Sequence, residues 1–282
     1  MMHRESAPDF PTQHDQTIIP QSIMPPSTPS QPLAVSATHA DLLARARQLA
    51  AQLDLVLTLD PADPAFPLLL VITPDHLELR QTGPEAEGPL WVDFTSGAIE
   101  YRRRQGTSRK EAIARAVGLK GGTSLSVLDL TAGLGRDGFV LASLGCTVQM
   151  VEQSAVVAAL LADGIERAQH QPSLAKIMAR LSLQMGDSIE LLRHWQGERP
   201  EVITIDPMYP HRKKSALVKK EMRFLRVLVG DDQQSDQLLT ASLTVASRRV
   251  VVKRPRLAEP LAGPAPNFAV SGKNSRFDVY LP

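Results

Sequence analysis

The 282-residue sequence has a single cysteine, few aromatic residues and almost no net charge. Cys146 alone excludes an internal disulfide and a cysteine metal cluster, and is typical of a core residue in a reducing cytoplasm. With a net charge of +1, no overall field indicates nucleic acid, so any basic surface must be local. No apolar run reaches the roughly 18 residues of a membrane-spanning helix, and the N-terminus lacks a signal-peptide core. We therefore expect a cytoplasmic protein with no membrane or metal partner.

Composition divides the chain into three parts. Residues 1–36 are rich in Pro, Ser, Thr and Gln and cannot bury enough apolar surface to offset the entropy of ordering, which predicts a disordered tail. Residues 37–100 predict a small, β-rich N-terminal α+β subdomain, and residues 101–282 predict an α/β domain with a mostly parallel sheet. In the subdomain we expect a helix at 40–53 and strands at 55–59, 68–73, 76–80 and 90–94.

The stretch 125–152 predicts the central βαβ unit. A strand ends at Asp129, a glycine turn follows with Gly133, Gly135 and Gly138, then a helix, and a second strand ends on Glu152. Three glycines at this spacing, followed by an acid, match a dinucleotide-binding site. An NAD-dependent oxidoreductase is therefore one alternative.

Two features favour a ligand without phosphate. Asp129 ends its strand four residues before the first glycine, and the charge of Asp137 would repel a pyrophosphate at the helix N-terminus. S-adenosylmethionine, with a ribose, an adenine and a sulfonium cation, fits such a site. In the structural alternative, Asp129 and Asp137 only cap turns and helices.

Acidic residues stand at the ends of four predicted strands. They are Asp129, Glu152, Asp187 and Asp206. The carboxyl ends of parallel strands meet at one edge of a sheet, where ligands bind. We expect Glu152 to hold the ribose and Asp187 to face the adenine.

The loop after the last of these strands reads Asp206-Pro207-Met208-Tyr209. It resembles the Asp/Asn-Pro-Pro-Tyr/Phe loop of methyltransferases that modify exocyclic amino groups. The Asp206 carboxylate and the Pro207 carbonyl would orient a poorly nucleophilic amine, and Tyr209 would stack on an unpaired or flipped base. The alternative is a strand-ending turn with a packed tyrosine.

A basic loop and helix follow at 211–223. We predict RNA phosphate contacts there, and prefer such a contact over a general-base role for His211. The predicted contacts are Arg212, Lys213, Lys214, Lys219, Lys220 and Arg223. The arginine run 102–104 is either another such segment or a solvated face.

The chain closes with a strand at 248–255 and a hairpin of strands 268–271 and 276–280. A terminal antiparallel hairpin on a parallel sheet is the Rossmann-like arrangement of class I S-adenosylmethionine-dependent methyltransferases. From about residue 68 to residue 280 the chain resembles the bacterial 16S ribosomal RNA guanine-N2 methyltransferase J family. The segments that carry the resemblance are 73–80, 92–94, 129–137, 206–211, 213–223 and 249–255.

This resemblance implies methyl transfer from S-adenosylmethionine to the exocyclic N2 amino group of a specific guanine in 16S rRNA, free or within the small ribosomal subunit. It also implies cofactor contacts at Arg136, Asp137, Glu152, Gln153, Asp187, Ser188 and Asp206. A non-catalytic RNA-binding assembly factor is a further alternative, because the basic segment alone would suffice for it.

Overall fold

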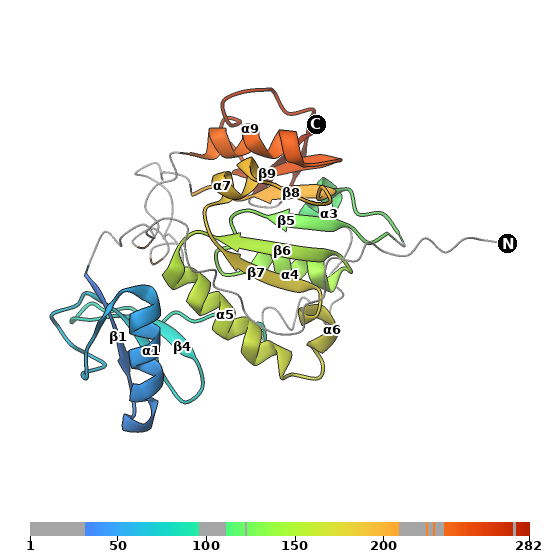
Figure 1. The fold of residues 1–282 in the computed structure, drawn as a ribbon. Coiled ribbons are helices and arrows are strands. Elements are labelled where there is room, and N and C mark those ends of the chain that lie inside the picture. The colour runs from blue at the N-terminus through green and yellow to red at the C-terminus, as the bar shows by residue number, and fades with distance from the viewer. Residues whose placement is uncertain are drawn as a thin grey trace.

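The computed structural model describes residues 32–95, 111–121, 123–208, 224, 228, 234–272 and 275–282. These residues form two sheets, a small one near the N-terminus and a large one that makes up the rest of the fold (Figure 1). The predicted disorder of residues 1–31 lies outside the described residues. None of the helices in the described part is long and apolar enough to cross a membrane.

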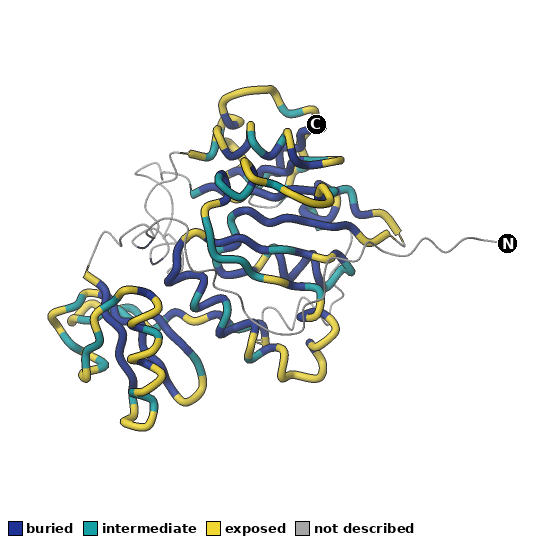
Figure 2. The backbone as a smooth tube through the Cα atoms, in the orientation of Figure 1, coloured by how far each residue is buried: buried dark blue, intermediate teal, exposed yellow. Residues whose placement is uncertain are grey.

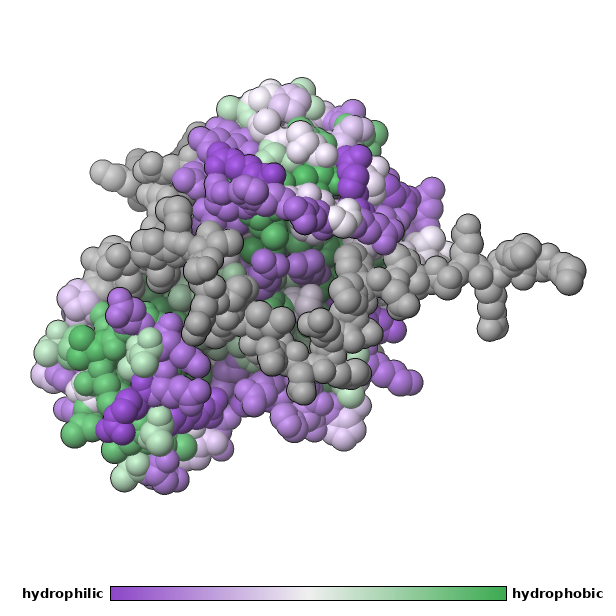
Figure 3. Space-filling model, in the orientation of Figure 1, coloured by the Kyte–Doolittle hydropathy of each residue, from purple (hydrophilic) through white to green (hydrophobic). Residues whose placement is uncertain are grey.

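The small sheet has the strand order β2-β1-β3-β4. Its strands are β1 (Leu33–Ala37), β2 (Val56–Leu57), β3 (Leu68–Ile72) and β4 (Leu77–Gln81). β1 runs parallel to β2 and β3, whereas β4 is antiparallel to β3. The short helix η1 (Ala40–Leu42) leads into α1 (Leu43–Leu53), which packs on β1. Val56 and Leu59 of this subdomain are exposed, and Figure 3 shows apolar surface on this part of the molecule.

Two predictions for this region need correction. Residues 33–36 were assigned to the tail, but they belong to β1, where all five residues are buried; the Pro-rich neighbourhood masked a short apolar run. The strand expected at 90–94 is reduced to one bridge between Leu79 and Leu90. The chain after that bridge packs instead against the large domain.

The large sheet has seven strands in the order β10-β11-β9-β8-β5-β6-β7. The five strands from β9 to β7 are parallel, and β10 and β11 form the predicted antiparallel hairpin at one edge. Their bounds are β5 (Ser126–Asp129), β6 (Thr147–Glu152), β7 (Leu181–Met185), β8 (Val202–Ile205), β9 (Arg249–Pro255), β10 (Phe268–Ser271) and β11 (Ser275–Tyr280). The order reverses between β5 and β8, so the topological switch point lies there.

Helices cover both faces of this sheet, and its central strands β5 and β8 are buried (Figure 2). A hydrophobic core lies on each face of the sheet, and successive strand residues point to opposite faces. Val127 packs in one core and Leu128 in the other. One face carries α3 (Ala112–Val117), α4 (Arg136–Ser143), α5 (Ala155–Gln169) and α6 (Ala175–Met178). The other carries α7 (Ser188–Arg193) and α9 (Ser235–Val245). The fold is the predicted Rossmann-like α/β arrangement.

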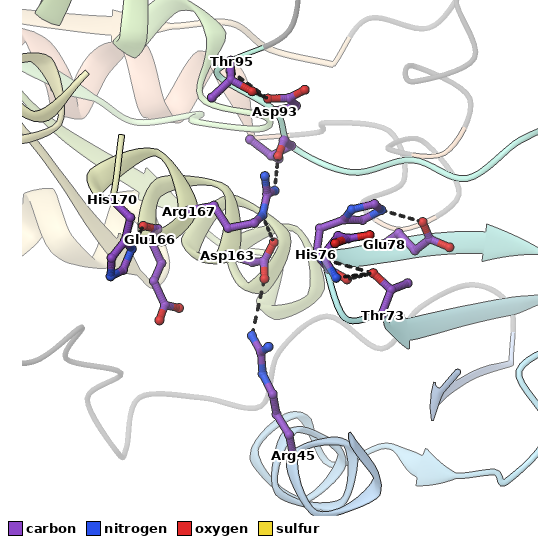
Figure 4. Close-up of polar contacts among 12 residues, drawn as sticks. Arg45, Thr73, His76, Glu78, Asp93, Thr95, Asp163, Glu166, Arg167 and His170 are labelled. Atoms are coloured by element: carbon purple, nitrogen blue, oxygen red, sulfur yellow. Dashed lines mark hydrogen bonds and ion pairs between the residues drawn. The ribbon is translucent and has the colours of Figure 1, made fainter. Parts of the chain in front are cut away.

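The segment 91–95 and helix α5 join the two parts of the molecule (Figure 4). On α5, Asp163 accepts hydrogen bonds from Arg45 of α1 and from Arg167, and Arg167 donates to the carbonyl of Val92. Gly164 lies directly against Val92, where a Cβ atom would be 2.5 Å from the valine Cγ1. The N-terminal subdomain is thereby fixed along α5.

Candidate active site

A cavity of about 580 Å³ opens at the carboxyl ends of the parallel strands. This size lies within the range of small-molecule sites. Among the described residues, its charged lining has five carboxyl groups and two cations. They are Asp129, Asp137, Glu152, Asp187, Asp206, Arg136 and Lys253. The four strand-end acids predicted from sequence therefore meet in one cavity.

Glu152 ends β6 and is almost fully buried, at 6% exposure. One carboxylate oxygen accepts the N–H of Gly133 at 2.8 Å, and the other accepts the N–H of Ser154 at 2.9 Å. Burial raises the pKa of Glu152, while these N–H donors act in the opposite direction. The carboxylate thus ties the glycine turn to the start of α5, and its remaining lone pairs are available to a ligand in the cavity.

The glycine turn closes tightly before α4. Gly133 and Gly135 both have positive φ, at +53° and +71°. A Cβ atom on Gly135 would lie 2.6 Å from Leu161 Cδ1 and 3.1 Å from Phe94 Cζ, so only glycine fits there. Phe94 also stacks on Phe139 of α4, with ring centroids 5.1 Å apart. The segment that leaves the N-terminal subdomain therefore packs directly against the predicted cofactor turn.

Asp129, at the end of β5, is 4% exposed. Burial, followed by the negative charge of Asp137, raises its pKa to about 7. Its contact with the Thr131 N–H is long, at 3.4 Å, so this turn bond is weak. Asp137 does not cap α4, whose N-cap is Gly135; instead, its Oδ2 accepts a hydrogen bond from Lys253. The capping alternative accounts for neither carboxyl group well.

Asp187 and Ser188 begin α7 beside the cavity. Asp187 caps the helix, because its Oδ1 accepts the N–H groups of Ile189 and Glu190 at 2.7 and 3.0 Å. The Ser188 hydroxyl donates to the carbonyl of Leu130 at 2.7 Å and is buried. These two side chains thus hold strand ends and a helix start in place, and Asp187 Oδ2 is the atom left for a ligand.

Asp206 follows β8 at the switch point, two residues after Thr204, which is paired with Asp129 of β5. Its backbone N–H donates to Thr131 Oγ1 at 2.6 Å, which locks the ends of β5 and β8 together. Its carboxylate is 44% exposed, into the open cavity, and Oδ2 accepts a hydrogen bond from Lys253 Nζ at 2.7 Å. Burial and the charge of Asp137 raise the pKa of Asp206, and Lys253 opposes both.

Lys253 and Thr131 were not predicted as site residues. Lys253 Nζ lies 2.7 Å from both Asp137 and Asp206. Burial alone would lower the pKa of Lys253, but the charges of Asp206 and Asp137 outweigh it and raise the pKa. The sequence does contain a signal for Lys253: it directly follows the Val-Val-Val run of β9, which places it at the same sheet edge as the strand-end acids.

The remaining predicted cofactor residues, Gly133, Gly135, Arg136 and Gln153, are also at this edge, and three of them line the cavity with Pro207. Tyr209 and the basic segment 211–223 lie outside the described residues, so their predicted contacts stay predictions. Within the described ranges, no group of three His, Cys, Asp or Glu side chains is arranged to hold a metal ion.

The donor set fits S-adenosylmethionine better than a dinucleotide. Acidic groups surround the cavity, as a cationic sulfonium requires, and Asp137 stands in the first turn of α4 where a pyrophosphate would bind. Glu152, Gln153, Asp187 and the glycine turn are the groups that would hold its ribose, adenine and amino-acid portions.

Comparison with known proteins agrees with this chemistry. A family described as putative SAM-dependent methyltransferase matches residues 48–282. A ribosomal RNA small subunit methyltransferase J from Thioalkalivibrio sulfidiphilus is 51% identical over 250 residues, covering 88% of this chain and 97% of the relative. The Pseudomonas aeruginosa protein of the same name is 50% identical, with 88% and 94% coverage.

A crystal structure of a SAM-dependent methyltransferase from Neisseria gonorrhoeae has a TM-score of 0.66 and 38% identity, covering 88% of this chain and 96% of that one. The fold and cofactor are therefore those of an S-adenosylmethionine-dependent methyltransferase, which sets aside the oxidoreductase alternative. The chain belongs to the ribosomal RNA small subunit methyltransferase J family.

Proposed function

We propose that this enzyme transfers the methyl group of S-adenosylmethionine to the exocyclic N2 amino group of a guanine in the small-subunit ribosomal RNA. The names of its relatives support ribosomal RNA of the small subunit as the substrate. The observation that carries the choice of an amine is the position of Asp206 and Pro207. Both follow β8 directly and line the same cavity as Glu152 and the glycine turn.

The chemistry of the acceptor explains why a carboxylate is needed there. The lone pair of an exocyclic amino group is delocalised into the base, so the nitrogen is a weak nucleophile. S-adenosylmethionine, when bound, supplies a methyl group made electrophilic by its sulfonium. Asp206 accepts a hydrogen bond from the amine, and the Pro207 carbonyl accepts the second; together they aim the lone pair at the methyl carbon.

The charge of Asp206 matters more in the transition state than before it. Formation of the N–C bond would leave the C–S electron pair on sulfur and make the nitrogen cationic. The hydrogen bond to a carboxylate strengthens with that charge. The new ammonium-like nitrogen then loses a proton to restore the neutral methylamino group, and the Asp206 carboxylate that holds the amine would accept it.

Tyr209 and the basic segment complete the proposal. Tyr209, two residues beyond Pro207, would stack on the flipped or unpaired guanine. The cations between Arg212 and Arg223 would neutralise backbone phosphates, which makes RNA binding dependent on salt.

The decisive experiment is a methylation assay on 16S RNA and on small subunits from a strain that lacks the gene. Mass spectrometry of the digested RNA should identify N2-methylguanine at one position. RNA binding without transfer from labelled cofactor would instead favour the non-catalytic assembly factor.

Asp206→Asn tests the role of the carboxylate. The variant keeps the shape of the side chain and loses its charge, so we expect single turnover at saturating cofactor to fall about a hundredfold or more, with nearly unchanged RNA affinity. Asp187→Asn is the matched control, because it removes a charge from the same cavity and asparagine can still cap α7. That control should weaken cofactor binding and leave the saturated rate intact. A wild-type rate for Asp206→Asn would rule out amine orientation by this residue.

A further inference from the structure

Lys253 lies where a cation is unexpected. It extends from β9 into a cavity that takes a cationic cofactor, and its side chain is only 30% exposed. Its ammonium group contacts Asp137 in the first turn of α4 and Asp206 after β8, each at 2.7 Å. β9 pairs with β8 so that Val252 is opposite Ile205, and this register places Lys253 beside Asp206.

The contact engages one carboxylate oxygen of Asp206 and not the other. Oδ2 accepts from Lys253, while the backbone N–H of Asp206 is held by Thr131. Among the described residues, Oδ1 has no hydrogen-bond partner. A carboxylate fixed at its backbone and at one oxygen presents the second oxygen in a defined direction.

The charges around Asp206 explain why such a fixed cation is needed. The described charged groups facing it are Asp137 on α4 and Lys253 on β9, with Asp129 of β5 close enough to interact. Without Lys253, three carboxyl groups would share the end of the cavity and would repel one another, so they would retain protons. A protonated Asp206 could not stabilise a developing positive charge.

We propose that Lys253 is a positioning residue that holds Asp206 as a charged carboxylate through Oδ2, leaving Oδ1 to accept the hydrogen bond of the target amine. This role rests on the proposed function of Asp206. A purely structural role, in which Lys253 only ties α4 to β9 through Asp137, is the competing interpretation.

Two variants separate these roles. Lys253→Met keeps much of the length and apolar volume and removes the charge, whereas Lys253→Arg keeps the charge. Arg248→Met is the matched control: Arg248 forms an ion pair with Glu201 just before the start of β9, far along the strand from the cavity. All variants are first compared by thermal unfolding, so that a loss of folding is recognised.

The first readout needs neither cofactor nor RNA. Carbon-13 NMR of labelled aspartate carboxyl groups, assigned through Asp206→Asn, gives the titration midpoint of Asp206 in the free protein. We expect Lys253→Met to raise this midpoint by about one pH unit or more, and Lys253→Arg and Arg248→Met to leave it nearly unchanged.

The second readout is single-turnover methylation against pH at saturating cofactor. Lys253→Met should be about ten- to a hundredfold slower than wild type near pH 7 and should recover part of the loss as pH rises, because Asp206 then ionises unaided. Lys253→Arg should restore most of the rate.

The outcomes distinguish the two proposals. If wild type transfers no methyl group to the RNA, the proposed function fails, and the NMR titration still decides whether Lys253 controls the charge of Asp206. If wild type is active but Lys253→Met leaves both the Asp206 midpoint and the shape of the pH profile unchanged, the positioning role is wrong, even if the rate falls.

Discussion

Asp129 shares its end of the cavity with Asp137 and Asp206, and among the described residues the ammonium group that contacts these acids is that of Lys253. Lys253 contacts the latter two, and Asp129 is left with burial and two neighbouring negative charges, which raise its pKa to about 7. An aspartate that takes up a proton near neutral pH changes the charge of the cavity within the working range of the enzyme.

This proton also affects folding in a defined direction. The unfolded Asp129 ionises near pH 4, whereas the folded one keeps its proton until about pH 7. The folded state therefore binds more protons across that window, and the stability contributed by this group falls as pH rises through it.

Cofactor affinity should follow the opposite trend. Because a sulfonium cation prefers an ionised neighbour, we expect the dissociation constant of S-adenosylmethionine to fall about three- to tenfold from pH 5.5 to pH 7.5. Isothermal calorimetry would measure it. Asp129→Asn should flatten this dependence.

S-adenosylhomocysteine provides the control ligand, because it has the same amino-acid and nucleoside parts and lacks the positive charge. Its affinity should vary less over the same pH range. Equal pH dependence for the two ligands would contradict a direct effect of the Asp129 charge on the sulfonium.

Site residues were predictable from the sequence where the residue type and its place at a strand end were enough to indicate a ligand contact. Asp129, Glu152, Asp187 and Asp206 were foreseen because each acid lies at or just after the end of a predicted strand, and the structure brings all four into one cavity. Lys253 was not, because its partners Asp137 and Asp206 are 116 and 47 residues away in sequence. That pairing exists only after β8 and β9 lie side by side.

The turn between β5 and α4 depends on close packing from two distant elements. Gly135 is covered by Leu161 of α5 and by Phe94 from the segment that follows the N-terminal sheet. A substitution there has two separate costs, the positive φ and the steric overlap.

We expect Gly135→Ala to lower the free energy of unfolding by about 2–4 kcal/mol and to weaken cofactor binding, since the backbone strain and the steric overlap both apply. Gly145→Ala is the control, because Gly145 also has positive φ, at +102°, with no atom within 4 Å of an added Cβ. That variant should lose only about 1–2 kcal/mol, the backbone term. Urea unfolding of both proteins would test this, and equal losses would mean that the packing of Leu161 and Phe94 contributes nothing.

Elements with a clear apolar pattern were predicted closely, as the strands that end at Asp129 and Glu152 show. Short elements were less predictable. The strand expected at 90–94 is absent as a strand. Tertiary packing decides the backbone there, because Phe94 reaches the glycine turn.

Helix α5 connects the N-terminal subdomain to the large domain. Asp163 is 6% exposed and binds both Arg45 of the N-terminal subdomain and Arg167, so its charge links the small sheet to the large domain (Figure 4). Arg167 in turn holds the carbonyl of Val92, just before the segment that covers Gly135.

Asp163→Asn should therefore lower the unfolding free energy by about 1–3 kcal/mol, because two arginines lose a buried charged acceptor. It should also loosen the N-terminal subdomain, which limited proteolysis within residues 91–95 would detect. Glu166→Gln, the same charge change at an exposed position of the same helix, is the control and should be close to neutral. Equal unfolding free energies and equal proteolysis of the two variants would argue against a role of Asp163 in connecting the two parts of the molecule.

The two-part architecture and the parallel sheet with its terminal hairpin were both predictable, because composition shifts and alternating strand and helix patterns are local properties. The attachment of the small sheet along α5 was not, since it depends on Gly164 and Asp163 facing inward together. The start of β1 was also missed, because a five-residue segment with four apolar residues has no periodic context next to a Pro-rich stretch.

The strand order also dictates when the cavity at the strand ends can first form during synthesis. β5 pairs with β6 nearby in sequence, but its other neighbour is β8, with Val127 opposite Val202. Closing that loop is entropically costly and slow compared with local pairing. A nascent chain can therefore form the Glu152 side of the cavity early, whereas Asp129 meets Asp206 only after β8 has left the ribosome. Lys253 arrives later still, so ribosome-bound chains that lack β9 lack the residue that we propose positions Asp206.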